Sequence, residues 1–161
     1  MNKEITKQFD NWDYIQNLSL DILKSVSDEQ LGLTVGKNMG TLGEQFRHII
    51  RVRFQYAEAI ENKIVADIIE NIEPESAKSK LKLIELWKKA NDKLLDILNK
   101  SSKIGSEDFL IDWKHWGIES MNIFDHLNAL MDHEMLHNGE IIVYLKTYEI
   151  PFPKSWEPWG L

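Results

Sequence analysis

Residues 133–137, HEMLH in one-letter code, match the H-E-x-x-H pattern of zinc proteases. Two histidines four residues apart on a helix point the same way, with Cβ atoms about 6 Å apart, which suits two imidazoles on one ion. In a zinc protease, Glu134 would activate water and a downstream residue, for which Glu157 is suitably placed, would complete the site. Short patterns also arise by chance, so His133 and His137 are equally consistent with hydrogen-bonded core or surface histidines.

A helical wheel places the two histidines of this motif apart from its glutamate. Apolar residues of the segment 120–148 fall in one arc, which predicts a helix with a buried face. One edge of that arc carries a set of polar side chains, where the helix passes from the core to a side wall: His126, His133, His137, Glu140 and Tyr144. Ligands that project between neighbouring helices need this position.

Glu134 lies about 20° from the centre of the apolar arc, away from the histidine edge. A carboxylate there must be paired, hydrogen-bonded or neutral. It would either lie at a dimer interface or contact one of three arginines of the second predicted helix: Arg47, Arg51 or Arg53. A protease also needs a sheet edge to align an extended peptide, and no segment before the motif is typical of a sheet. The wheel therefore favours a metal site over a protease.

A third ligand must come from another element. His48 lies on the flank of the second predicted helix, together with Gln45, Val52 and Gln55. If His48 faced the groove between this helix and the fourth predicted helix, it would complete a three-histidine site. If it faced outward, it would be an ordinary surface residue, and its spacing is compatible with both. His126 lies about 10 Å along the axis from His133, which favours a packed or supporting histidine.

Four segments have apolar residues at three- and four-residue steps, which predicts helices over 3–26, 41–62, 74–99 and 120–148. Capping boxes begin the second helix at Thr41 and a short turn at Ser27, and Ser120 is a candidate cap for the fourth helix. No segment has a convincing strand pattern. These elements predict an all-α domain over residues 1–161, an antiparallel four-helix bundle.

Two further segments are rich in aromatic residues. The irregular stretch 101–119 contains DWKHWG, where Trp113 is a candidate pocket residue and His115 a surface or rim residue. The tail 150–161 is rich in proline and predicts stiff, extended chain. Trp156 and Trp159 would then cover the helices or a dimer contact, with a pocket lining as the alternative.

Composition limits the chemistry further. The chain has no cysteine, so any ion must be held by His, Asp or Glu. A net charge of −7 disfavours nucleic acid as a partner. No window has the roughly 20 apolar residues of a membrane span, and the charged N-terminal segment does not resemble a signal peptide. We therefore expect a cytoplasmic protein.

Two segments resemble the DinB/YfiT-like superfamily of metal-binding helical bundles. TLGEQFRHI, residues 41–49, is similar to the capped second helix of that family with its histidine. DHLNALMDHEMLHNGEI, residues 125–141, is similar to its H-x-x-x-H-x-G-[Q/E] segment, with Glu140 where many members have Gln. The order and length of the helices match over nearly the whole chain.

The resemblance implies that His48, His133 and His137 bind one divalent ion, with His126, Glu140, Tyr144, Gln45 and Trp113 as supporting or pocket residues. Three imidazoles suit zinc, nickel, iron or copper, and manganese is a further candidate. Some members are S-transferases that use a low-molecular-weight thiol, and one branch is an isomerase. The expected function is thiol transfer or hydrolysis on a small electrophile, with a non-catalytic metal-binding bundle as the alternative. The resemblance also implies a homodimer, and Gly139 within the helix predicts a close helix–helix approach.

Overall fold

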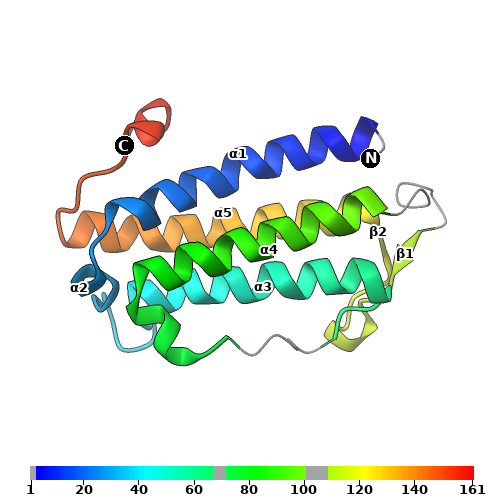
Figure 1. Ribbon diagram of the computed structural model, residues 1–161, viewed down its shortest axis with the longest axis horizontal. Helices are drawn as coiled ribbons and strands as arrows, with labels where there is room; N and C mark the ends of the chain where they lie inside the picture. The colour runs from blue at the N-terminus through cyan, green and yellow to red at the C-terminus, as the bar shows by residue number, and fades with distance from the viewer. Residues whose placement is uncertain (1–2, 67–71, 101–108) are drawn as a thin grey trace.

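The computed structural model describes residues 3–66, 72–100 and 109–161, and these residues are mostly helical. Four long helices lie side by side along the long axis of the molecule (Figure 1). Their bounds are α1 Lys3–Ser25, α3 Leu42–Asn62, α4 Lys80–Lys100 and α5 Ile123–Thr147. Within the described ranges no helix is long and apolar enough to cross a membrane.

The neighbouring helices are not all antiparallel, which corrects the predicted arrangement. Contacts between α3 and α4 run from the Phe46–Trp87 ring pair to the Glu58–Lys93 ion pair, so these two helices are parallel (Figure 1). The 21 residues of α3 span about 32 Å, and the connection 63–79 is long enough to return over that distance. The order of side-chain contacts along each pair of helices shows in the same way that α1 and α5 are parallel, whereas α3 and α5 are antiparallel.

Capping groups account for where the helices begin. At Thr41 and Ser27 both hydrogen bonds of a capping box are present, and they start α3 and the short α2 (Asp28–Leu31). Two predicted starts were wrong. Asn122, not Ser120, caps α5 by accepting from two backbone N–H groups. Pro74 begins a separate 3₁₀ helix, η1 (Pro74–Lys78), and α4 starts only at Lys80.

A two-stranded pair, which the sequence analysis did not predict, lies beside the end of α3. Strands β1 (Leu110–Ile111) and β2 (Met121–Asn122) pair antiparallel, with the 3₁₀ helix η2 (Lys114–Trp116) between them. The backbone of Asp112 hydrogen-bonds that of Lys63 and Val65, which ties this segment to the C-terminal end of α3. Strands of two residues are too short to show an alternating pattern in the sequence.

The C-terminal segment packs against α1 through η3 (Lys154–Trp159). Trp156 is buried in the core cluster and donates from Nε1 to the Leu18 carbonyl at 3.0 Å. Trp159 is about half exposed and donates to the Tyr14 hydroxyl at 3.1 Å. The tail therefore covers the helices.

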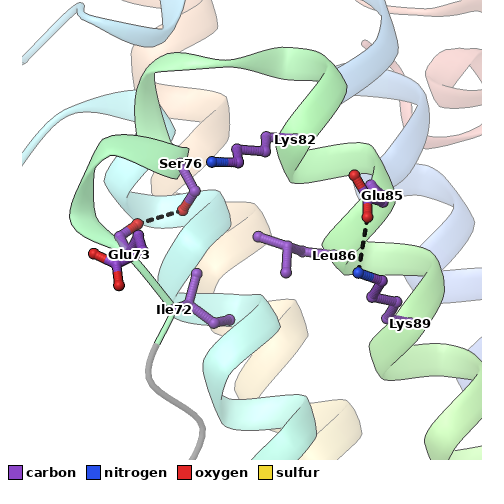
Figure 2. Close-up of a pocket in the computed structure, with 7 residues that line it drawn as sticks. All are labelled: Ile72, Glu73, Ser76, Lys82, Glu85, Leu86 and Lys89. Atoms are coloured by element: carbon purple, nitrogen blue, oxygen red, sulfur yellow. Dashed lines mark hydrogen bonds and ion pairs between the residues drawn. The ribbon is translucent and has the colours of Figure 1, made fainter.

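Two glycines show where helices approach closely and where they do not. A Cβ on Gly43 would lie 1.9 Å from the Ala77 carbonyl oxygen, so glycine allows η1 to pack on α3. Among the described residues, a Cβ on Gly139 would meet nothing within 4 Å, so the predicted close approach at Gly139 is wrong for this part of the chain. A small pocket of about 170 Å³ lies between η1 and α4, lined by paired charges such as Glu85 and Lys89 and by no histidine (Figure 2).

Candidate metal centre

The structure brings His48 of α3 together with His133 and His137 of α5. Nε2 of His133 lies 3.2 Å from Nε2 of His48 and 3.1 Å from Nε2 of His137. One nitrogen of each ring lies within 4.8 Å of the others, and all three side chains are partly buried. His48 thus faces the groove and not the solvent, the choice that its spacing left open.

These nitrogen separations fit a single ion with imidazole ligands. Zn–N bonds of 2.0–2.1 Å place two ligand nitrogens about 3.4 Å apart in a tetrahedron and about 2.9 Å apart in an octahedron. The Nε2–Nε2 separations of 3.2 and 3.1 Å in the triad lie between these values. When each of the three Nε2 atoms turns a lone pair inward, the lone pairs repel one another, and a cation among them removes this repulsion.

Glu140 orients the ring of His137. Its Oε2 lies 2.6 Å from Nδ1 of His137, which is the geometry of an Nδ1–H donor to a carboxylate. Nε2 of His137 is then left with its lone pair toward His48 and His133. A carboxylate on the outer nitrogen is a frequent partner of a metal-binding histidine. His133 differs, because its Nδ1 is buried without a partner in the described part of the chain, so packing holds this ring.

The model of the DinB family matches residues 1–148, which is most of the chain. The chain belongs to the DinB family. Its fold is similar to that of a DinB-like protein, YjoA, from Bacillus subtilis, with a TM-score of 0.70 and 17% sequence identity. That likeness covers 92% of this chain and 97% of the YjoA chain. A search of curated proteins finds no match.

Burial keeps His48 and His133 of this DinB-family chain neutral. Desolvation, followed by the nearby His137 and His48 and the charge of Arg53, lowers the pKa of His133 to about 3. Desolvation also lowers the pKa of His48, with a smaller effect of His137 in the same direction. Both rings therefore offer a lone pair at physiological pH, which is the form that binds a metal.

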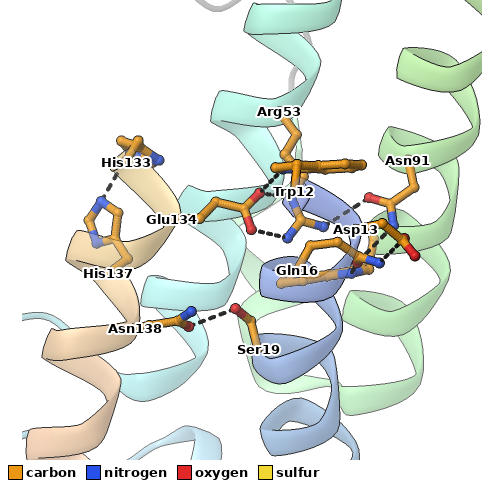
Figure 3. Close-up of polar contacts among 11 residues, drawn as sticks. Trp12, Asp13, Gln16, Ser19, Arg53, Asn91, His133, Glu134, His137 and Asn138 are labelled. Atoms are coloured by element: carbon orange, nitrogen blue, oxygen red, sulfur yellow. Dashed lines mark hydrogen bonds and ion pairs between the residues drawn. The ribbon is translucent and has the colours of Figure 1, made fainter. Parts of the chain in front are cut away.

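Glu134 faces away from the triad, which removes the main support for a protease. Its carboxylate receives two hydrogen bonds from the guanidinium of Arg53, one of them 2.8 Å long, and a third from Trp12 Nε1 at 3.0 Å. Figure 3 shows Glu134 projecting toward α1 and α3 while His133 and His137 project from the other side of α5. Of the three arginines considered, Arg53 is the partner. Glu157 lies on η3 and is exposed, so it does not replace His48.

His126 packs beside the site. Its Nδ1 accepts from Trp113 Nε1 at 3.2 Å, so its proton lies on Nε2, which donates to the Tyr56 carbonyl at 3.0 Å. Both ring nitrogens are therefore engaged. Burial lowers the pKa of His126 to about 4, so the ring is neutral. His126 orients the Trp113 indole.

Two other predicted pocket residues do not reach the triad. The Tyr144 hydroxyl donates to the carbonyls of Met39 and Gly40, and the Gln45 amide donates to the Met39 carbonyl at 2.5 Å. Together they hold the loop before α3 against α5. Exposed His115 lies on η2 outside the triad.

A pocket of about 230 Å³ opens beside the triad, with His48 and His133 in one wall. The other walls are lined by Val52, Gln55, Tyr56, Val65, Trp113 and Trp116. The sequence analysis named Trp113 as a pocket residue and missed three members: Tyr56, Val65 and Trp116. Tyr56 could have been found, because it follows His48 by eight residues, about 2.2 helical turns, which places it on the same broad side of α3.

Proposed function

We propose that the four long helices form a DinB-type bundle that binds one divalent ion through His48, His133 and His137. The observation that carries this proposal is the convergence of three imidazole nitrogens, two pairs of them 3.1 and 3.2 Å apart, with Glu140 on the outer nitrogen of His137. Imidazole binds a metal in its neutral form, so three histidine ligands would leave a bound ion its full charge.

The proposed activity is metal-dependent attack of a thiol or water on a small electrophile. A divalent ion with three protein ligands keeps open positions and lowers the pKa of a water or thiol bound there. The chain itself contributes the orientation of His137 through Glu140 and a largely apolar pocket beside the triad. The pocket favours an enzyme over a purely structural ion.

The metal content of the purified protein tests the site. We expect close to one equivalent of divalent ion per chain, measured by mass spectrometry of the metals, and less than about half of that in His133→Ala. The matched control is His115→Ala, an exposed histidine outside the triad, which should keep the wild-type content. Equal metal in wild type and His133→Ala would contradict the proposal.

Activity separates the enzyme from the structural alternative. Thiol conjugation to a panel of small electrophiles is expected to occur with the loaded protein and to be lost with chelator and in His133→Ala. A protein that holds its ion but shows no metal-dependent rate with any thiol or with water would instead be a bundle whose ion ties α3 to α5.

A further inference from the structure

The pocket beside the triad has walls that carry no fixed charge. Val52, Val65 and Trp113 are buried, and Tyr56 forms a ring contact with Trp113 at 5.5 Å. Burial, assisted by the charge of Asp132, raises the pKa of Tyr56 to about 12, so its hydroxyl is neutral. The one amide, that of Gln55, already donates to the Ala66 carbonyl at 2.6 Å.

The volume of this pocket and the residue at its rim restrict the size and type of ligand that fits. An apolar cavity of about 150 Å³ is enough for benzene, whereas pockets for drug-sized ligands begin at about 300 Å³. The volume here, about 230 Å³, lies between them. Trp116 at the rim is 53% exposed, so an indole face is available to a ring that enters.

We propose that this pocket binds the uncharged aromatic ring of a small, single-ring molecule, with the reactive end of that molecule toward His48 and His133. A charged group would lose its hydration beside Val52 and Val65 and would find no oppositely charged side chain among the lining residues. Only the orientation of the ligand, with its reactive end toward the triad, rests on the proposed function. The affinity for the ring does not depend on the ion.

Fluorine NMR with two matched probes tests the pocket. Uncharged 4-fluorotoluene should bind the protein as purified, and its affinity should change by no more than a few-fold when chelator removes the metal. The 4-fluorobenzylammonium cation should bind at least about tenfold more weakly, because its charge is desolvated. If this difference in affinity persists without metal, ring binding by the pocket is tested separately from the proposed metal chemistry.

Two tryptophans of similar exposure provide a variant and its control. Trp116→Ala should weaken 4-fluorotoluene binding at least about fivefold through loss of the aromatic contact. Trp159→Ala, at 49% exposed and on η3, should leave it unchanged. Equal affinities for the two probes, or an unchanged affinity in Trp116→Ala, would overturn the proposal.

Discussion

Glu134→Leu is expected to lower the free energy of unfolding by about 3–5 kcal/mol, because it leaves a buried guanidinium without its counter-ion. Arg53 and Glu134 are both fully buried, and the guanidinium carbon of Arg53 lies 3.5 Å from the centre of the Trp87 ring and 5.4 Å from that of Trp12. The leucine side chain offers no acceptor in place of the lost carboxylate. The loss should appear as a lower midpoint in urea unfolding followed by circular dichroism.

Removing both charges should recover most of this loss. In Arg53→Met with Glu134→Leu no buried charge remains, and apolar replacement of a buried ion pair is often close to neutral. Trp12 Nε1 and the Asn91 side-chain oxygen still lose their partners, so we expect a residual cost of about 1–2 kcal/mol.

The exposed pair Glu85–Lys89 of α4 is the matched control for Glu134→Leu. Both side chains are 61% exposed, so Glu85→Ala should leave the midpoint of urea unfolding nearly unchanged. A cost below about 1 kcal/mol for Glu134→Leu would show that the pair is hydrated.

Local chemistry explains which parts of this structure could be predicted from the sequence. The capping boxes at Ser27 and Thr41 and the apolar steps of α1 and α3 involve residues only three or four positions apart, and the structure has those helices where they were expected. His133 and His137 are one helical turn apart, so their common direction follows from helix geometry alone. The wheel also placed Glu134 in the core, where the structure has it.

Contacts between distant segments could not be obtained in this way. Whether His48 faces the groove depends on how α3 and α5 pack, and the choice of Arg53 for Glu134 depends on the rotation of α3 about its axis. The parallel α3 and α4 depend on the path of a long connection. Ser120 and Asn122 are both good caps, and the choice between them follows from β2, whose pairing with β1 is non-local.

Stability of the metal-free protein is expected to fall by up to about 3 kcal/mol between pH 6.5 and pH 4 because of His126. Burial lowers the pKa of this ring to about 4 from an ordinary value of 6.5. In that pH range the unfolded chain binds a proton at His126 and the folded chain does not. The loss of stability caused by His126 is therefore absent above about pH 6.5, grows as the pH falls, and changes little below pH 4.

His126→Gln isolates this effect from the other titrating groups. A glutamine oxygen can accept from Trp113 Nε1 and its amide can donate to the Tyr56 carbonyl, so both hydrogen bonds of His126 have a neutral replacement. Urea unfolding at a series of pH values, with chelator present, should give a shallower loss in the variant. The two curves should differ by up to about 3 kcal/mol more at pH 4 than at pH 7. Parallel curves would mean that folding does not exclude the proton from His126, in which case the ring that orients Trp113 is charged as readily in the folded chain as in the unfolded one.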